Sequence, residues 1–250
     1  MSRTARVLTM LGLAAGFVAV SGTPAHAAIP TLGGGSGIVF DQGKPGAPTP
    51  ATGLGCTLTA VGYDRSDNLV ALTNAHCFTA ADGTKLIGDE VYRDKSPAGT
   101  SVNWATKVEA DLDAGPLGTV AYVSEQNNLL SGGPPGLDFA VIKLDPARVA
   151  PTKTVGGVTL TSVGPPPAAG TIMCKEGHTT GLTCGMKLGT NGKWFTHTVW
   201  TWSGDSGSPV AVGQTLVGNA WGAQHSSPIL SIIDEMNANG GVGAGFRLAT

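Results

Sequence analysis

The stretch TWSGDSGSPV, residues 201–210, places Asp205, Ser206 and Ser208 among glycines and a proline, directly after an aromatic segment. Gly, Asp, Ser and Pro are all turn formers, so a surface turn is one interpretation. The other is a nucleophilic serine on a tight turn whose backbone N–H groups hold a developing oxyanion. The second interpretation requires a base and a group that orients the base elsewhere in the chain.

Residues 1–27 have the layout of a secretory signal peptide. Arg3 and Arg6 precede an apolar run from Val7 to Val20, and the small-x-small pattern at residues 25–27 is typical of a cleavage site. The run is too short to span a membrane. We therefore expect a secreted protein that is not held at a membrane after cleavage. An extended arm is expected over residues 28–52, with a short strand at 38–40.

Composition favours a chain of short strands. Glycine accounts for 38 of 250 residues, and only 13% of residues are charged. With many valines and threonines, this favours strands joined by tight turns, so we expect an all-β fold. Without the two arginines of the signal peptide, 13 of the 15 basic residues remain against 17 acidic ones. No clustered basic face for a nucleic acid is expected, and the protein is expected to be a monomer.

The four cysteines, Cys56, Cys77, Cys174 and Cys184, fit two disulfides in an exported chain. Three pairings are possible, and pairing neighbours in sequence is the simplest. No C-x-x-C motif occurs and the histidines do not cluster with the thiols, which disfavours zinc. We expect neither a metal nor another cofactor.

The chain from residue 53 to 250 is expected to form one domain with two halves, over about 53–150 and 155–250. Runs of strand-like residues recur in each half at a spacing that predicts barrel- or sandwich-like units. The segment SSPILSIIDEMNANGG, residues 226–241, predicts the one convincing helix. Ser227 is expected to cap it, Pro228 to occupy its first turn and Gly240 to end it.

A base for Ser206 has four candidates in the mature chain: His76, His178, His197 and His225. His76 follows an apolar strand and adjoins Cys77, so a disulfide from Cys77 to Cys56 would hold its backbone in place. A neutral imidazole can accept the serine proton, and a carboxylate on the other ring nitrogen stabilises the imidazolium. For the other histidines, a surface or structural role is the better interpretation.

The orienting carboxylate is expected to be Asp138, which directly precedes the apolar strand DFAVIKL. A carboxylate there would be partly buried and in need of a partner. Asp111 and Asp113, two residues apart near a turn, are more typical of solvated acids or a loose calcium site. Asp205 adjoins the serine and cannot orient a distant imidazole, so we interpret it as shaping the turn.

The motifs TNAHC, DFAVIKL and GDSGSPV, in this order, resemble the three catalytic segments of the chymotrypsin-like serine proteases. CKEGHTTGLTCG resembles the disulfide loop of their bacterial secreted branch, the streptogrisin and α-lytic type, and the match spans about residues 53–246. The resemblance implies two six-stranded antiparallel β-barrels with a C-terminal helix and the site between the barrels. An α/β-hydrolase would need G-x-S-x-G and the order Ser, acid, His, which this chain lacks.

The resemblance implies a role for each matching residue. His76 would be the base, Asp138 its orienter and Ser206 the nucleophile, with the amides of Gly204 and Ser206 as oxyanion hole. Ala220, Trp221 and Gly222 resemble the strand that pairs with the substrate backbone and walls the specificity pocket.

Departures from the family pattern bear on specificity and activation. Ser208 replaces the usual second glycine, as in glutamate-specific relatives, but the His that those relatives carry before the substrate strand is Asn219 or Ala220 here. Cleavage after glutamate is therefore disfavoured. No acidic residue occupies TVWTWS, residues 198–203, so cleavage after Lys or Arg is disfavoured as well. Trp200, Trp202 and Trp221 either line a pocket or fill the second barrel.

No Arg- or Lys-Ile-Val-Gly-Gly site precedes the domain, which speaks against activation by a newly cut N-terminus. Either the protein is active once exported, or Asp205 lacks a partner and the oxyanion turn is poorly formed. We expect a secreted serine endopeptidase that acts on proteins or peptides through an acyl-enzyme. The alternative is a protease-fold protein that binds a partner without turnover.

Overall fold

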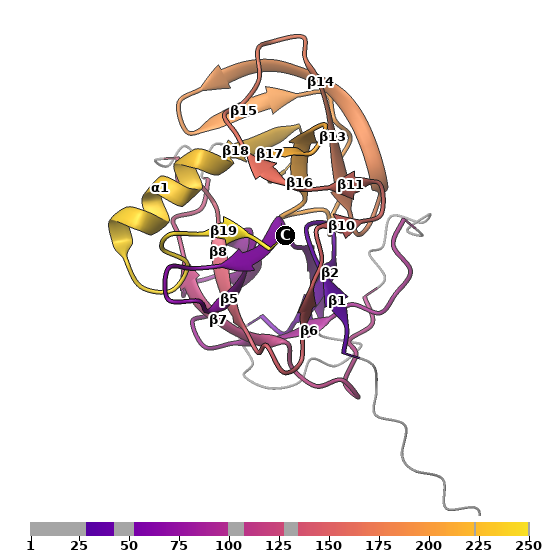
Figure 1. Cartoon of the computed structure of the whole chain (residues 1–250), viewed down its shortest axis with the longest axis vertical. Coiled ribbons are helices and arrows are strands. Elements are labelled where there is room, and N and C mark those ends of the chain that lie inside the picture. The colour runs from indigo at the N-terminus through magenta and orange to yellow at the C-terminus, as the bar shows by residue number, and fades with distance from the viewer. Residues whose placement is uncertain (1–28, 43–52, 100–107, 128–134, 223, 250) are drawn as a thin grey trace, which may run out of the picture.

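The computed structural model describes residues 29–42, 53–99, 108–127, 135–222 and 224–249. The expected signal peptide and the second part of the expected arm lie outside these residues. Strands dominate the described chain, and its one α-helix, α1, spans Ile229–Asn239. Figure 1 shows two groups of strands stacked on each other, with the N-terminal strands in indigo and magenta and the C-terminal strands in orange. The expected all-β, chymotrypsin-like fold is confirmed.

The N-terminal half is an eight-stranded curled sheet in the order β19-β4-β5-β8-β7-β6-β2-β3. Its strands are β2 (Gly37–Phe40), β3 (Leu54–Thr57), β4 (Ala60–Tyr63), β5 (Leu69–Thr73), β6 (Glu90–Arg93), β7 (Gly118–Val123), β8 (Ala140–Leu144) and β19 (Arg247–Leu248). All their pairings are antiparallel. The C-terminal segment returns to the first half, where β19 pairs with β4 as an end strand of this sheet (Figure 1).

The C-terminal half is a closed barrel. Its strands are β12 (Ser162–Val163), β13 (Ile172–Gly177), β14 (Gly181–Asn191), β15 (Trp194–His197), β16 (Pro209–Val212), β17 (Thr215–Ala220) and β18 (His225–Pro228). They pair in the order β12-β17-β16-β13-β14-β15-β18, and a further β17–β18 pairing closes six of them into a ring. Of the two expected barrels, this one is closed by ladder hydrogen bonds, whereas the sheet of the first half remains open between its end strands.

The segment expected as an extended arm contributes to the core. All four residues of β2 are buried, and β2 lies between β3 and β6. Before it, β1 (Thr31–Leu32) pairs in parallel with β9 (Ala150–Pro151), in the connection between the halves. That connection continues through the short hairpin of β10 (Thr154–Val155) and β11 (Val158–Thr159). The first described residues therefore pair with the N-terminal sheet and with the connection between the halves.

The helix α1 begins one residue later than the sequence predicts. The expected cap by Ser227 is wrong, because Ser227 lies in β18 opposite Asn219 and the backbone stays extended through Pro228. Pro228 itself is extended, with a ψ of 129°, and pairs with Gly218 of β17, which explains the delay. Gly240 ends the helix, as expected, but its φ of 68° and ψ of −167° lie outside the left-handed helical region that the cap was expected to adopt.

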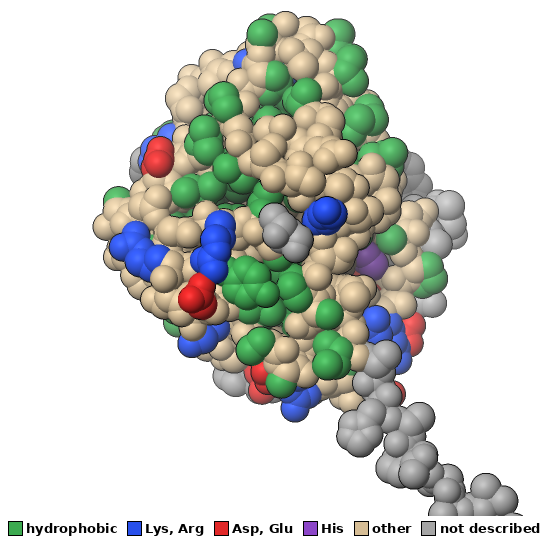
Figure 2. All heavy atoms as spheres, viewed as in Figure 1, with side chains coloured by type: hydrophobic (Ala, Val, Ile, Leu, Met, Phe, Trp, Pro, Cys, Tyr) green, Lys and Arg blue, Asp and Glu red, His purple; other side chains and the backbone are tan. Residues whose placement is uncertain are grey.

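The apolar face of α1 joins the two halves. Ile229, Ile232 and Met236 are buried in one cluster with residues of both halves, among them Leu72, Phe139 and Leu216. Since this cluster spans the junction, burial of the helix holds the halves together. On the face shown in Figure 2, charged side chains lie singly or in small groups among polar and apolar atoms. The helical part of the described chain is too short and polar to cross a bilayer.

Candidate active site

Ser206 lies on a turn that only glycine-rich sequence can form. Gly204 and Gly207 have φ values of 91° and 90°, in the region that favours glycine. A Cβ on Gly207 would lie 2.0 Å from the carbonyl oxygen of Thr57. The Thr57 amide donates to the Ser206 carbonyl at 2.7 Å, and the Gly207 amide donates to the Ala220 carbonyl at 2.8 Å. Both halves of the fold therefore hold this turn.

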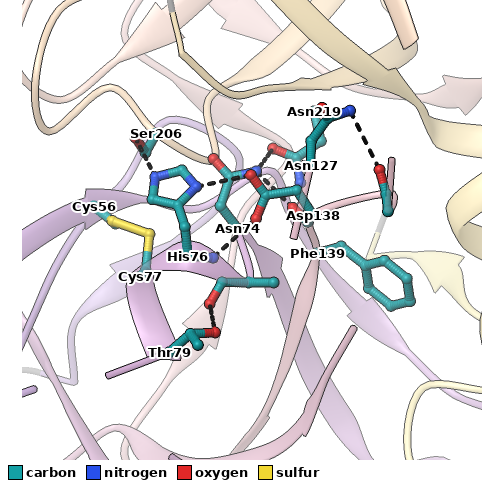
Figure 3. Close-up of polar contacts among 12 residues, drawn as sticks. Cys56, Asn74, His76, Cys77, Thr79, Asn127, Asp138, Phe139, Ser206 and Asn219 are labelled. Carbon is teal, nitrogen blue, oxygen red and sulfur yellow. Dashed lines mark hydrogen bonds and ion pairs between the residues drawn. A yellow bond between two sulfur atoms is a disulfide. The ribbon is translucent and has the colours of Figure 1, made fainter. Parts of the chain in front are cut away.

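His76 stands at the start of a short 3₁₀ helix, η1 (His76–Phe78), that follows β5. Its neighbour Cys77 is joined to Cys56 of β3 by a disulfide, which fixes the backbone beside the imidazole (Figure 3). The ring points at the serine: His76 Nε2 lies 2.8 Å from Ser206 Oγ. These two residues are 130 positions apart in sequence.

Asp138 occupies the other side of the imidazole. Its Oδ2 lies 2.8 Å from His76 Nδ1, and its Oδ1 accepts a hydrogen bond from the His76 backbone amide at 2.8 Å. The carboxylate is buried, and the residue has a φ of 52°, which is unusual outside glycine. Figure 3 shows His76 between Asp138 and Ser206. The geometry makes Nδ1 the protonated ring nitrogen and leaves Nε2 to accept a proton from the serine.

The electrostatics of the pair favour a charged imidazole. Burial alone would lower the pKa of His76, but the charge of Asp138 and its hydrogen bond outweigh this, so the pKa is raised above its ordinary value of 6.5. An imidazolium formed during a reaction would therefore be stabilised here. The His76 side chain still exposes 37% of its surface, so a substrate can reach it.

Two buried asparagines connect the halves behind this group, and the sequence interpretation missed them. Asn74 Nδ2 donates to the Asp138 carbonyl at 2.8 Å and to Asn219 Oδ1 at 3.0 Å. Asn219 in turn donates to the carbonyl of Thr73 at 3.1 Å. The position of Asn74 two residues before His76 was a signal, but its partner on β17 is 145 residues away.

Two backbone amides at this turn, those of Gly204 and Ser206, are of interest for an oxyanion. Within the described residues, no acceptor takes the amide hydrogens of Gly204 or Ser206. The Thr57 hydroxyl donates to the Gly204 carbonyl at 2.7 Å, which fixes the orientation of the following peptide group. Free N–H groups at this place are suited to hold an oxyanion.

Asp205 has a cation partner that the sequence interpretation did not identify. Lys175 Nζ lies 3.4 Å from Asp205 Oδ2, and both side chains are fully buried. Of the two alternatives that the sequence left open, the one in which Asp205 lacks a partner is therefore wrong. Burial lowers the pKa of Lys175, and the charge of Asp205 opposes this. Lys175 adjoins Cys174, whose disulfide to Cys184 closes the β13–β14 hairpin.

Three backbone amides and one hydroxyl donate hydrogen bonds to the carboxylate of Asp205. Its Oδ1 accepts from the amides of Thr179 and Thr180 at 3.0 Å each. Its Oδ2 accepts from the Thr180 hydroxyl at 2.6 Å and from the Trp202 amide at 2.9 Å. Asp205 is thus fixed by the hairpin turn that follows β13, as its expected role in shaping the turn requires.

The three remaining histidine candidates do not contact Ser206. His178 Nε2 lies 3.2 Å from Asp94 Oδ2, at the junction of the halves. His197 is fully buried with Nε2 2.8 Å from Ser226 Oγ, and burial, then the charge of His225, lowers its pKa to about 4. The His225 ring stacks on Trp221 at 5.1 Å.

A cavity of about 240 Å³ opens beside Ser206, between residues 200–206 and the end of β17. Ala220 and Gly222, two of the expected substrate-binding residues, line it. The third, Trp221, does not; it is buried with 7% exposure. Of the three tryptophans in question, Trp200 and Trp202 line the cavity.

A second cavity, of about 250 Å³, is lined by His76, Cys56 and Cys77 and shares Ser203 and Ser206 with the first. Cys56, His76 and Cys77 bring possible metal ligands within 4.8 Å of one another. Because the two sulfurs are bonded to each other, neither can act as a thiolate ligand. Ser206 thus lines both cavities.

Comparison with known proteins assigns the chain to a family. Three crystal structures share its fold, and in each the matched region covers 88% of this chain. Thermobifida fusca protease A has a TM-score of 0.58 and 19% sequence identity, with 100% of its own chain covered, and Nocardiopsis protease has a TM-score of 0.57 and 16% identity, also with 100% covered. Cellulomonas bogoriensis chymotrypsin has a TM-score of 0.54 and 20% identity, with 99% of its own chain covered. No curated protein matches the sequence. Residues 56–218, more than half of the chain, match the trypsin-like peptidase domain. The chain therefore belongs to the trypsin-like peptidase family.

Proposed function

We propose that this protein is a secreted serine endopeptidase that hydrolyses peptide bonds through an acyl-enzyme, with Ser206 as nucleophile. The observation that carries the proposal is the continuous chain of contacts from Asp138 through His76 to Ser206, with 2.8 Å on each side of the imidazole. Membership of the trypsin-like peptidase family supports a hydrolase. The two disulfides are compatible with an oxidising, extracellular location.

In the acylation step, Ser206 Oγ attacks the carbonyl carbon of the substrate while its proton passes to His76 Nε2. Asp138 stabilises the resulting imidazolium through Nδ1. The substrate carbonyl oxygen becomes an oxyanion, which the amides of Gly204 and Ser206 stabilise. The tetrahedral species then collapses, the C–N bond breaks, and the leaving amine takes the proton from Nε2.

In the deacylation step, water replaces the departed amine. His76 accepts a proton from the water as its oxygen attacks the ester carbon, and the same two amides hold the second oxyanion. Breaking the ester bond returns the proton to Ser206 Oγ and releases the carboxylic acid product. Each residue thus returns to its starting state.

The proposal is tested with the mature, oxidised protein and a reduced, alkylated protein as unfolded substrate. New N-termini identified by mass spectrometry should form with the wild type and be absent with Ser206→Ala. Fragment formation that persists in Ser206→Ala would contradict the proposal. A folded wild type that binds the unfolded substrate without cutting it would favour the alternative, a protease-fold binding protein.

A further inference from the structure

Thr57, the last residue of β3, holds the turn of Ser206 through its backbone and its side chain. Its amide donates to the Ser206 carbonyl at 2.7 Å, and its hydroxyl donates to the Gly204 carbonyl at 2.7 Å. Thr57 is fully buried, and the hydroxyl bond joins residues 147 positions apart, one in each half of the fold. One residue of the N-terminal half therefore holds two carbonyl groups of a turn that belongs to the C-terminal half.

The two carbonyls belong to alternate peptide groups of the turn. A peptide group is planar, so a hydrogen bond to its carbonyl oxygen also restrains its N–H. The Ser206 amide belongs to the peptide group between Asp205 and Ser206, and the groups on both sides of it accept hydrogen bonds from Thr57. The Gly204 amide belongs to the group before these. Thr57 therefore limits rotation of the Ser206 amide from both sides and of the Gly204 amide from one side.

The turn depends on such a restraint because of its glycines. Gly204 and Gly207 stand on either side of Asp205 and Ser206, and glycine has the greatest backbone freedom of all residues. Amides stabilise an oxyanion well only when their direction is fixed before the reaction, so that no reorganisation is needed during it. The glycines allow this conformation, and contacts from outside the turn have to maintain it.

Thr57 is itself held at three points. The Thr73 hydroxyl donates to its carbonyl at 2.8 Å, and the neighbouring Cys56 is joined to Cys77 by a disulfide. The His178 amide donates to the Thr57 hydroxyl oxygen at 3.1 Å. A hydroxyl has one hydrogen to donate, and that of Thr57 is directed to the Gly204 carbonyl.

The bond from His178 also connects the hydroxyl to the hairpin turn that follows β13. His178 precedes Thr179 and Thr180, whose amides hold the carboxylate of Asp205. The Thr57 hydroxyl therefore links this hairpin turn to the turn of the nucleophile. A valine has nearly the shape of threonine but could make neither bond, whereas a serine could make both.

We propose that Thr57 is a positioning residue for peptide hydrolysis, because its hydroxyl holds the amides of Gly204 and Ser206 in the direction that an oxyanion requires. The inference rests on the proposed function. The hydroxyl bonds only to backbone groups of the protein, so it acts through the turn and not on the substrate.

The test compares Thr57→Val with the wild type on a peptide chosen from the fragments that the wild type produces. Loss of an interaction made only in the transition state lowers kcat and leaves KM unchanged. Removal of a whole oxyanion donor costs about 100–1,000-fold in kcat; here both amides remain and lose only a restraint, so we expect a fall of about 10-fold in kcat with KM within about 2-fold. A kcat within about 2-fold of the wild type would overturn the inference, as would a loss carried by KM alone.

Thr59→Val is the matched control for loss of a buried hydroxyl. Thr59 is also fully buried, and its hydroxyl has no hydrogen-bond partner in the part of the chain that the structure describes. This variant should keep the wild-type kcat, and Thr57→Ser, which retains the hydroxyl, should keep most of it. An equal loss in Thr59→Val and Thr57→Val, or a Thr57→Ser as slow as Thr57→Val, would overturn the inference.

The pH profile separates positioning of the amides from damage to the triad. The contacts of His76 with Asp138 and Ser206 do not involve Thr57, so the acid limb of kcat/KM in Thr57→Val should stay at the wild-type pH. A displaced acid limb would overturn the inference. The value of kcat is expressed per active site, counted by fluorophosphonate labelling taken to completion, so that a less stable variant is not mistaken for a slower one.

If Thr57→Val does not fold, Thr57→Ser and Thr57→Ala replace it in the test. Both lack the methyl group and they differ only in the hydroxyl, so Thr57→Ala should have a kcat about 10-fold below that of Thr57→Ser, and equal values would overturn the inference.

The two levels of the proposal fail differently. If the wild type cleaves no peptide and a fluorophosphonate does not label Ser206, the proposed function fails. If the wild type is labelled and active and Thr57→Val is equally fast, only the inference about Thr57 fails.

Discussion

Replacing Lys175 with methionine should unfold the protein at a markedly lower temperature. Methionine, like lysine, has an unbranched side chain of similar length, but it is uncharged. The carboxylate of Asp205 therefore stays buried without its cation. Breaking a buried ion pair in this way typically costs about 3–5 kcal/mol. Asp205 retains its donors from Thr179, Thr180 and Trp202, so we expect the lower end, about 3 kcal/mol.

For a chain of this size, such a loss corresponds to a fall in Tm of roughly 6–12 °C. The assay is thermal unfolding followed by tryptophan fluorescence, with Lys85→Met as control. Lys85 forms an ion pair with Glu125 at 2.6 Å, but the pair is solvent-exposed, so its loss should cost no more than about 1 kcal/mol.

A second variant separates the charge from the packing. Lys175→Met combined with Asp205→Asn removes both charges and should be more stable than Lys175→Met alone. If Lys175→Met melts within about 2 °C of the wild type, the pair does not stabilise the turn and the reasoning is refuted. The reasoning is also refuted if the Tm of the double variant is no higher than the Tm of Lys175→Met.

Three further perturbations test other parts of the account. Asp138→Asn should lower kcat/KM by roughly 10,000-fold. It should also move the acid limb of the pH profile of kcat/KM to lower pH, because His76 must be neutral to act and Asp138 raises the pKa of His76; an acid limb at the wild-type pH would contradict this. His197→Asn should make the protein less sensitive to acid, because burial lowers the pKa of His197 from 6.5 to about 4 and the folded chain therefore binds fewer protons than the unfolded chain between these values. As the pH falls from 7 to 4.5, His197 should cost the wild type about 2 kcal/mol of unfolding free energy, measured by urea unfolding at both pH values, and equal acid sensitivity in both proteins would argue against this. Removing the Cys56–Cys77 disulfide by paired serine substitution should cost about 3 kcal/mol in urea unfolding, because the bond closes a loop across 21 positions, and a loss below about 1 kcal/mol would count against a stabilising role.

Local signals in the sequence predicted most of the fold. Glycine-rich turns and short apolar runs gave the all-β class, and the spacing of Ile229, Ile232 and Met236 gave the helix. These features depend on neighbours within a few positions. The helix start could not be predicted in the same way, because pairing of Ser227 with Asn219 on another strand keeps the backbone extended.

The candidate site likewise contains residues that local motifs predicted and residues whose roles depend on distant segments. The resemblance to known protease segments predicted His76, Asp138 and Ser206, and the structure brings these three side chains together. It did not predict Lys175, because a lysine in a short strand is normally exposed and its burial follows from packing against distant segments. The Asn74–Asn219 contact was missed for the same reason, since its members lie on different halves of the fold.

The central claim is that Ser206 is a nucleophile activated by His76. Its most direct test is reaction of the mature, oxidised protein with a fluorophosphonate, followed by mass spectrometry of the labelled peptide. We expect one label on Ser206 in the wild type and none in Ser206→Ala or in a folded His76→Ala. A folded wild type that remains unlabelled, or a His76→Ala variant labelled at the wild-type rate, would contradict it.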